Sequence, residues 1–370
     1  MFNINDFYNH PKVHKMEWED LVIFTYSREC QYDRSWDDIT MAARGIIFNK
    51  VTGELIARPF KKFFNLTETF ETSFGNLPDG PFVATEKVDG SLGICFPYKD
   101  QYWIATKGSF QSVQAIWATE WLRNNVHTKV LKGGWTYLFE VVYKENKIVV
   151  DYGDFEGLVL LSAVNIHTGE ECTYQQMVEE AGFLGVRPVK QEPGFSTLEE
   201  LYEYCKALPA TQEGFVVTFS NGLKVKIKGD TYCRIHKMIS RMTPLSYWEA
   251  WDLDLKDIPK EYLAQLPEEF RDVSDALYQQ IYDMHWEPFQ RIVQLYEGMK
   301  ALLGPGANKK TWAMRTKELH PQEFSSIMGL HNGKEGQVWW GLHKNVRPTW
   351  NILPQGVAGT DRIKRILSDS

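Results

Sequence analysis

The spacing of apolar residues changes character part-way along the chain. Up to about residue 240, short runs either alternate between apolar and polar residues or are apolar throughout, which predicts β-strands. From residue 259 to residue 303, apolar residues recur at intervals of three and four, which predicts helices. The pattern therefore predicts an α+β protein in two domains, with sheets in residues 1–240 and a mostly helical part in residues 241–370.

The individual elements follow from runs of β-branched, aromatic and aliphatic residues bounded by turn residues. Strands are expected at residues 21–26, 45–48, 54–59, 81–85, 92–96, 101–107, 137–143, 147–152, 157–164, 213–219 and 223–228. Helices are expected at residues 112–124, 174–182 and 197–207, with Ser196 or Thr197 as the cap of the last one. Gly304-Pro305-Gly306 should end the long helical run, whereas the tail around Trp339 and Trp340 has no period that assigns it.

Composition limits the class of protein. With 370 residues, 43% of them hydrophobic and 24% charged, the chain resembles an ordinary globular protein. No apolar run reaches the roughly 18 residues that a membrane helix needs. The first residues lack the basic and apolar segments of a signal peptide, and the five cysteines are scattered without a Cys-x-x-Cys pair. We therefore expect no membrane, disulfide framework or zinc site, and a cytoplasmic location.

One basic segment stands out in this acidic chain, whose net charge of −7 argues against a protein that coats nucleic acid without specificity. Lys224, Lys226 and Lys228 alternate with apolar residues, so all three fall on one side of a predicted strand. A solvated face is the simpler interpretation. Because neighbouring like charges repel, we favour a phosphate site on this strand.

The stretch Glu86-Lys87-Val88-Asp89-Gly90-Ser91 lies between two predicted strands. A lysine followed by the turn-forming pair Asp-Gly is held on rigid backbone and can be pointed into a cleft. Taken alone, the motif is more typical of a plain hairpin turn with a solvated lysine. We interpret Lys87 as a covalent nucleophile because of the charged residues elsewhere in the first domain.

Charged residues interrupt several of the predicted strands and their adjoining loops. They are Arg44, Lys62, Lys107, Glu140, Glu213, Lys226 and Lys228. A charge inside an apolar strand is costly unless it is paired or binds a metal. One such residue would most often form a structural ion pair, but two acids and several cations suggest a polar cleft for a polyphosphate and a divalent cation.

These motifs together resemble the covalent nucleotidyltransferase superfamily of ATP-dependent ligases and capping enzymes. The resemblance is carried by Lys87-x-Asp89-Gly90, Glu140, Glu213-Gly214 and Lys226-x-Lys228 in this order. More narrowly, residues 43–48, 58–66 and 106–109 are similar to the phage-type RNA ligases that repair tRNA anticodon loops (RNA ligase family one). The resemblance implies an antiparallel-sheet adenylyltransferase domain followed by an all-α C-terminal domain.

The same resemblance implies a reaction in three steps that consumes ATP with Mg²⁺ or Mn²⁺. Lys87 would take AMP from ATP, the AMP would pass to a 5′-phosphate of RNA, and a 3′-hydroxyl would then displace it to seal the strand. A free lysine titrates near pH 10.4. We expect Lys226, Lys228 and Arg44, together with the metal ion, to lower the pKa of Lys87 and so favour its nucleophilic neutral form.

The family's roles transfer to matching positions of this chain. The resemblance implies catalytic roles for Lys87, Glu213, Lys226 and Lys228. It implies that the nucleotide is bound by Tyr26, Arg44, Lys62, Phe64, Glu86, Lys87, Gly90, Lys107, Glu140, Lys226, Lys228 and Tyr232. Glu140 and Glu213 are the implied metal ligands. Asp252 or Asp254 would add a further metal contact, of which we favour Asp254, although an exposed acid is the simpler interpretation.

The implied partners are RNA ends, including tRNA nicked in its anticodon loop, bound by a monomer in a bacterial or phage-infected cytoplasm. A DNA ligase or capping-type enzyme is the first alternative, but those enzymes append a β-barrel where this pattern turns helical. The second alternative is a catalytically silent RNA-binding module. It predicts the loss of Lys87 or of the two glutamates, and all three are present.

Overall fold

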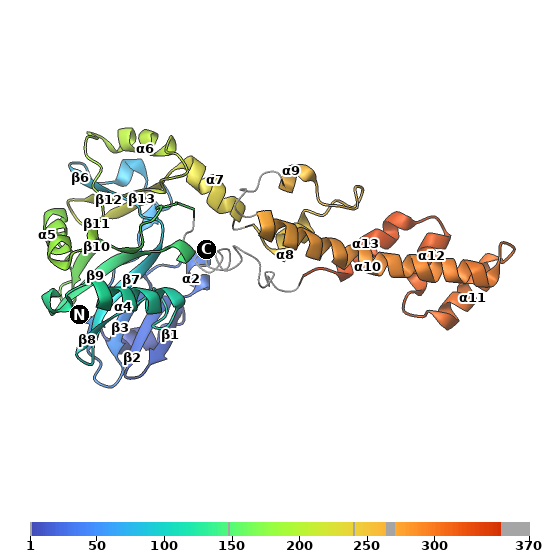
Figure 1. Cartoon of the computed structure of the whole chain (residues 1–370), viewed down its shortest axis with the longest axis horizontal. Coiled ribbons are helices and arrows are strands. Elements are labelled where there is room, and N and C mark those ends of the chain that lie inside the picture. The colour runs from blue at the N-terminus through green and yellow to red at the C-terminus, as the bar shows by residue number, and fades with distance from the viewer. Residues whose placement is uncertain (1, 147–148, 240, 264–270, 349–370) are drawn as a thin grey trace. The chain divides into compact units, whose positions relative to one another are not determined.

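A computed structural model describes residues 2–146, 149–239, 241–263 and 271–348 (Figure 1). The chain forms two compact units, Met1–Arg234 and Ile235–Ser370. Within the described residues, every strand belongs to the first unit and the second contains helices, which confirms the predicted α+β class. None of the described helices is both long and apolar enough to cross a lipid bilayer.

The strands are short and follow one another closely along the first unit. Their bounds are β1 Val13–Trp18, β2 Leu21–Tyr26, β3 Arg44–Asn49, β4 Leu55–Ala57, β5 Phe64–Asn65, β6 Phe82–Glu86, β7 Ser91–Tyr98, β8 Gln101–Ala105, β9 Trp135–Val142, β10 Gly157–Asn165, β11 Arg187–Pro188, β12 Gly214–Phe219 and β13 Lys224–Lys228.

Helices occur in both units. Those that begin in the first unit are α1 Ile4–Tyr8, α2 Arg28–Asp33, α3 Asp38–Ala42, α4 Val113–Asn125, α5 Tyr174–Leu184, α6 Leu198–Lys206 and α7 Asp230–Ile239, with 3₁₀ turns at Phe74–Asn76, Thr128–Val130 and Lys144–Asn146. The second unit contains α8 Pro244–Glu249, α9 Lys260–Leu263, α10 Arg271–Leu303, α11 Lys309–Leu319, α12 Phe324–His331 and α13 Glu335–Asn345.

The strands of the first unit form three sheets. Their orders are β1-β2-β3-β4, β11-β10-β9-β7-β8 and β5-β13-β12-β6. All pairings are antiparallel except the two-residue edge strands β11 and β5, which run parallel to β10 and β13. The predicted hairpin of β12 and β13 is confirmed, and it forms the centre of the third sheet.

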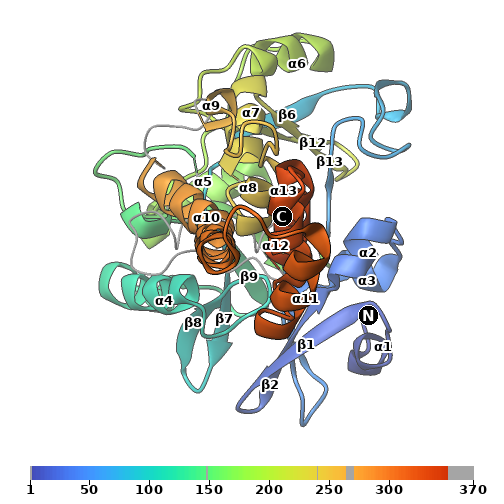
Figure 2. The same ribbon diagram turned by 90° about the vertical axis from the view of Figure 1, so that its right-hand side faces the viewer.

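Helix α4 covers the middle sheet and shows how the sequence pattern becomes a core. It contacts β7, β8 and β10, and Figure 2 shows it beside β7 and β8. Ala118 and Leu122 are fully buried there against Tyr137 and Phe139 of β9. Burial of such side chains contributes about 1.5–3 kcal/mol each for the large aliphatic and aromatic residues. The predicted helix at residues 112–124 is therefore confirmed, with Ser112 as its cap.

The predicted strand at residues 147–152 is wrong in its described part, since residues 147 and 148 lie outside the described residues. Residues 149–152 form no strand. The backbone amides of Val149 and Val150 donate instead to one carboxylate oxygen of Asp89, at 2.7 and 2.8 Å. The apolar run predicts a strand, but two of its backbone amides donate to the buried side chain of Asp89, which lies far away in the sequence.

The second unit is organised around the long helix α10, which Gly304 ends with a φ of +68°. This confirms the predicted break at Gly304. Trp339 and Trp340, which the sequence left unassigned, lie on α13. Trp339 is fully buried and stacks on Phe289 of α10 at 4.3 Å, whereas its neighbour Trp340 is exposed. Helix α13 thus presents one aromatic residue to the core of the unit and the next one to solvent.

Candidate active site

Strand pairing brings Lys87 and Glu213 together. Lys87 directly follows β6, Glu213 directly precedes β12, and these strands pair so that Glu86 lies opposite Phe215. The backbone amide of Lys87 donates to the carbonyl oxygen of Gly214 at 2.8 Å. The side chains also meet, because Nζ of Lys87 lies 2.6 Å from Oε2 of Glu213. The side chain of Glu213 is only 2% exposed, whereas that of Lys87 is 23% exposed, so the carboxylate is shielded from water while the lysine is still accessible.

The basic strand β13 supplies a second lysine partner for Glu213. Val225 and Ile227 are buried, while the alternating lysines lie on the opposite face, as the sequence predicts. Nζ of Lys228 lies 2.9 Å from the second oxygen of Glu213. Lys224 is paired with Glu171 at 2.9 Å. Lys226 alone of the three has no carboxylate partner within the described part of the chain.

Glu140 enters the same site from β9. Its strand pairs with β7 so that Glu140 lies opposite Leu92, just beyond the turn that carries Lys87. Gly90 lies against this strand, since a Cβ atom at Gly90 would come within 2.6 Å of the carbonyl oxygen of Val141 and 3.1 Å of Cγ of Glu140. The motif glycine is therefore required for a close approach between the two backbones.

The acids of the site keep Lys87 protonated. Burial alone would lower the pKa of its amine, but Glu213, Glu140 and Asp89 outweigh burial and raise that pKa above the usual value. The prediction that neighbouring cations lower the pKa of Lys87 is therefore wrong for the protein without nucleotide. The nearest partner of the amine is a carboxylate rather than another cation, and an ion pair favours the charged form.

The pKa depression that was expected at Lys87 occurs at Lys226. Burial, followed by repulsion from Lys62, Lys87 and other cations, lowers the pKa of Lys226 to about 6. Burial also raises the pKa of Glu140 to about 8. Repulsion from Glu213 and Asp89 adds to this effect, and attraction by Lys87 and Arg44 does not cancel it. Such opposite shifts in one enclosed site are typical of functional centres.

A second group of cations lies where β2 and β8 end and where β3 and β5 begin. Arg44 begins β3 next to Tyr26, whose backbone amide donates to the carbonyl oxygen of Ala43. One guanidinium nitrogen of Arg44, Nη1, is buried and has no hydrogen-bond partner. Electrostatic interaction also links Arg44 to Glu140, so this group adjoins the Lys87 site. A buried, unpartnered cationic donor is costly and indicates a place for an anionic ligand.

Aromatic rings surround the remaining predicted cations. Lys62 lies over the rings of Tyr26, Trp36 and Phe64, at 5.6, 5.2 and 5.3 Å from their centres. Lys107 lies over the same tyrosine ring at 4.9 Å. The structure thus brings together Tyr26, Lys62, Phe64 and Lys107, four of the residues that are predicted to bind the nucleotide. Trp36 was not predicted, since no motif or spacing singles it out.

The motif residue Asp89 fixes the turn that carries the nucleophile. It is 2% exposed and accepts hydrogen bonds from the amides of Val149 and Val150 and from the hydroxyl of Tyr232, the last at 2.9 Å. Its own amide donates to the hydroxyl oxygen of Tyr152 at 2.7 Å. The role of Asp89 is thus positional. The predicted nucleotide contact of Tyr232 stays a prediction, because its hydroxyl already donates to Asp89.

For two predicted residues the structure shows backbone hydrogen bonds that do not involve the charged residues of the site. Glu86 ends β6, and its backbone amide donates to the carbonyl oxygen of Lys190 at 2.8 Å. Asp254 belongs to the second unit, where its amide donates to the carboxylate of Asp252 at 2.8 Å. The nucleotide contact of Glu86 and the metal contact of Asp254 stay predictions.

The acids can support Mg²⁺ only with help from a ligand. Nowhere in the described ranges do three or more His, Cys, Asp or Glu side chains form a ready metal cage. Magnesium, however, is usually held by one or two carboxylates together with substrate phosphates and water. Glu140 suits that chemistry, since its carboxylate has no hydrogen bond or ion pair to another described residue. Glu213 does so less well, because each of its oxygens is paired with a lysine.

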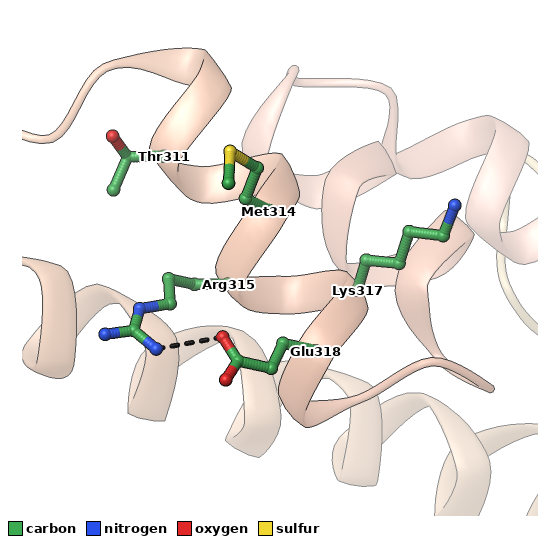
Figure 3. A pocket seen from close by; sticks show the side chains of 5 residues that line it. All are labelled: Thr311, Met314, Arg315, Lys317 and Glu318. Atoms are coloured by element: carbon green, nitrogen blue, oxygen red, sulfur yellow. Dashed lines mark hydrogen bonds and ion pairs between the residues drawn. The ribbon is translucent and has the colours of Figure 1, made fainter.

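A hollow on the second unit lies along one face of α11. Thr311, Met314, Arg315, Lys317 and Glu318 line it (Figure 3). All five side chains are exposed, and Arg315 donates to Glu318 at 2.8 Å. A surface formed by one exposed helix holds no buried polar group to recognise a ligand, so we assign no chemistry to it.

Comparison with known families agrees with this geometry. The family model described as RNA ligase matches residues 42–232, which cover more than half of the chain and include Arg44, Lys87 and Lys228. The chain belongs to the RNA ligase family. The matched region contains every predicted site residue except Tyr26 and Asp254.

Similarity to individual proteins extends over parts of the chain. A protein of Autographa californica nuclear polyhedrosis virus, provisionally named bifunctional polynucleotide kinase/RNA ligase, is 26% identical over 62% of this chain and 35% of its own length. One from Thermovibrio ammonificans, provisionally named RNA ligase, is 31% identical over 52% of each chain. This chain thus spans about a third and about half of these two relatives. The RNA ligase of Rhodothermus phage RM378 is 20% identical over 82% of this chain and 84% of its own.

Solved structures resemble the chain more distantly. A provisionally named ATP-dependent DNA ligase from Aquifex aeolicus is 15% identical over 89% of this chain and 87% of its own, with a TM-score of 0.48. The RNA ligase of Naegleria gruberi with PPi is 16% identical over 42% and 51% of the two chains, with a TM-score of 0.36.

Proposed function

We propose that this protein is an ATP-dependent RNA ligase that joins 5′-phosphate and 3′-hydroxyl ends. The observation that carries the proposal is Lys87, held 2.6 Å from buried Glu213 and close to Lys226, which has no carboxylate partner among the described residues. An amine beside unpaired cations and buried acids suits attack on a nucleotide phosphate. Membership of the RNA ligase family supports RNA as the substrate.

In the first step, Nζ of Lys87 forms a bond to the α-phosphorus of ATP and pyrophosphate leaves. Because the pKa of Lys87 is raised in the protein alone, its amine must lose protons and separate from Glu213 as the nucleotide binds. Lys226 and Lys228 lie on the β13 face beside Lys87 and would stabilise charge on the α-phosphate oxygens. Arg44, Lys62 and Lys107 would bind the outer phosphates.

The metal ion would be held by Glu140, with Glu213 direct or through water. When bound, it would neutralise phosphate charge and oppose protonation of the amine. Asp254 is proposed as a further ligand from the second unit. Burial raises the pKa of Glu140 to about 8, so its carboxyl group would be protonated at neutral pH before the metal binds. It would release that proton when it binds the cation.

The later steps begin from the AMP held on Lys87. The AMP on Lys87 passes to the 5′-phosphate of an RNA end, which regenerates the lysine and forms a 5′-to-5′ pyrophosphate bond. The 3′-hydroxyl of a second end then attacks the phosphate of the RNA, forms the phosphodiester bond and releases AMP. We infer a monomeric, cytoplasmic enzyme of bacterial or phage-infected cells whose RNA includes tRNA nicked in the anticodon loop.

Retention of labelled AMP tests the proposal. Protein is mixed with α-³²P-labelled ATP and Mg²⁺, denatured and separated from free nucleotide. The wild-type chain is expected to keep the label, while Lys87→Ala keeps none. Lys129→Ala, which changes an exposed lysine outside the site, is the matched control and should be labelled like wild type. An unlabelled wild-type chain would remove the ligase proposal.

Substrate choice tests the proposed preference for RNA and for tRNA nicked in the anticodon loop. The protein is given single-stranded RNA, a nicked DNA duplex and tRNA cleaved in the anticodon loop, and the sealed products are separated by size. Sealing of RNA but not of the DNA nick is expected, with cleaved tRNA sealed fastest. Equal rates on tRNA and unstructured RNA would contradict dedication to tRNA while leaving the ligase activity in place.

A further inference from the structure

Lys62 lies inside a cage of three aromatic rings. Tyr26 ends β2, Trp36 lies in the loop between α2 and α3, and Phe64 begins β5, so three separate segments supply the rings. Their centres lie between 5.2 and 5.6 Å from Nζ of Lys62. An ammonium group at this distance from a ring is attracted by the ring's negative face.

Trp36 is the member that joins the other two rings. It packs edge-on against Tyr26 with ring centres 4.9 Å apart, and against Phe64 with ring centres 5.5 Å apart. Tyr26 in turn carries Lys107, 4.9 Å above its centre. Loss of the Trp36 ring would therefore remove one contact of Lys62 and loosen the two rings that supply the others.

The backbone around Trp36 is fixed from both sides. The preceding residue, Ser35, donates its amide to the carbonyl oxygen of Cys30 at 3.2 Å, and its hydroxyl accepts from Lys12 at 2.6 Å. The following residue, Asp37, caps α3 with a capping box. Trp36 thus lies between the end of one helix and the start of the next, on a loop whose hydrogen bonds hold it in place.

The cations of this group keep their charge available. Lys62, Lys107 and Arg44 have no ion pair with a carboxylate within the described ranges of the chain. Rings attract a cation without neutralising it, so a cage holds Lys62 in place while leaving its positive charge for a ligand. A carboxylate in the position of Trp36 would hold the lysine as well but would repel a phosphate.

We propose that Trp36 is a positioning residue, which holds Lys62 and, through Tyr26, Lys107 in place to receive the outer phosphates of the nucleotide. The proposal rests on the proposed ligase function. Trp36 itself need not touch the nucleotide. Its effect is confined to the step that uses a triphosphate, since the sealing step begins from RNA that already carries AMP.

Two variants separate positioning from a general loss of structure. Trp36→Met keeps most of the side-chain volume without an aromatic face, and Trp36→Phe keeps a ring. With the full chain, KM and kcat for ATP are measured from the rate of labelling, and sealing is measured separately on RNA with a preformed 5′-adenylate. Inorganic tripolyphosphate is tested as a competitor of ATP.

Trp36→Met is expected to raise KM for ATP about tenfold and to weaken competition by tripolyphosphate by a similar factor. Trp36→Phe should stay within about threefold of wild type, and both variants should seal pre-adenylylated RNA at the wild-type rate. If Trp36→Met does not fold, judged by circular dichroism, Trp36→Leu takes its place.

Three results would overturn the proposal. Unchanged KM for ATP in Trp36→Met would show that the cage does not set the position of Lys62. Equal slowing of labelling and of sealing from pre-adenylylated RNA would mean that Trp36 supports the fold of the whole site. If the wild-type chain takes no label, the ligase function itself fails and this proposal fails with it.

Discussion

At the scale of single residues, the site is set by what each carboxylate oxygen accepts. Glu213 gives one oxygen to Lys87 and the other to Lys228, and this double pairing keeps both the acid and the nucleophile charged. Asp89 gives its oxygens to two backbone amides and a tyrosine hydroxyl, so it fixes a turn. Acids of similar exposure therefore differ in role because their partners differ.

A glycine of the nucleophile motif gives the sharpest prediction at this scale. Gly90→Ala would place a Cβ atom 2.6 Å from the carbonyl oxygen of Val141, and backbone atoms there cannot move aside cheaply. We expect a loss of about 1–3 kcal/mol in the free energy of unfolding, together with slower labelling by ATP. Urea denaturation measures the first and retained radiolabel the second.

Gly133→Ala is the matched control for this substitution. No atom lies within 4 Å of the Cβ position at Gly133, so its free energy of unfolding should change by less than about 0.5 kcal/mol. Equal stability of the two variants would contradict the close approach of Gly90 to β9.

At the scale of elements, helices α10 and α13 hold a pair of histidines in the second unit. His285 is fully buried, stacks on Trp251 at 3.9 Å, and donates from Nδ1 to the carbonyl oxygen of Ile281, which can only accept. Nε2 of neutral His285 then accepts from Nδ1 of His343 at 2.9 Å. Burial, opposed by the Ile281 bond and aided by His343, lowers the pKa of His285 to about 4.

This depressed pKa predicts that the second unit loses stability in acid. Between pH 6.5 and about 4, the unfolded chain binds a proton at this histidine and the folded chain does not, so stability falls as the pH falls through this window. A shift from 6.5 to about 4 corresponds to about 3 kcal/mol. Urea unfolding, followed by tryptophan fluorescence from pH 7.5 to pH 4, measures the loss.

His285→Phe serves as the control, because it keeps an aromatic ring beside Trp251 but cannot take up a proton. Its free energy of unfolding should depend less on pH over the same window than that of the wild type. Identical pH dependence in the two proteins would contradict a neutral, buried His285.

At the scale of the whole molecule, the chain is divided into two compact units, and the predicted site residues are gathered in the first. Every predicted site residue except Asp254 belongs to Met1–Arg234. Each unit has its own buried core, with Phe139 among the fully buried residues of the first and Trp339 among those of the second. The sequence places the domain boundary at residues 240 and 241, and we propose that division for the functional domains as well.

A fragment of residues 1–240 tests this division. Because it retains Lys87, Glu213 and the basic strand β13, we expect it to fold and to keep labelled AMP from ATP at a rate within about tenfold of the full chain, which is about 1.4 kcal/mol in the activation barrier. Circular dichroism establishes folding and retained radiolabel measures the reaction. A folded fragment that takes no label would show that the second unit supplies a needed group, with Asp254 as the first candidate.

Local patterns predicted most of the first unit. Turn residues and apolar runs placed β6, β7, β12 and β13 within a few residues, because short strands in this chain coincide with the runs themselves. Thr197 was one of two predicted caps, and it forms the capping box of α6. Residues 149–152 could not be predicted in this way, since their amide partner lies about 60 positions away in the chain.

The sequence by itself determined which residues are candidates for the chemistry, because a motif of fixed order names Lys87, Glu140, Glu213 and Lys226 without coordinates. Only the tertiary structure decided their charges and neighbours. The distance from Lys87 to Glu213 and the repulsion at Lys226 depend on strand pairing across more than a hundred residues, and electrostatic energy depends on separation and burial. For the same reason Trp36 could be found only after folding brought its ring to Lys62.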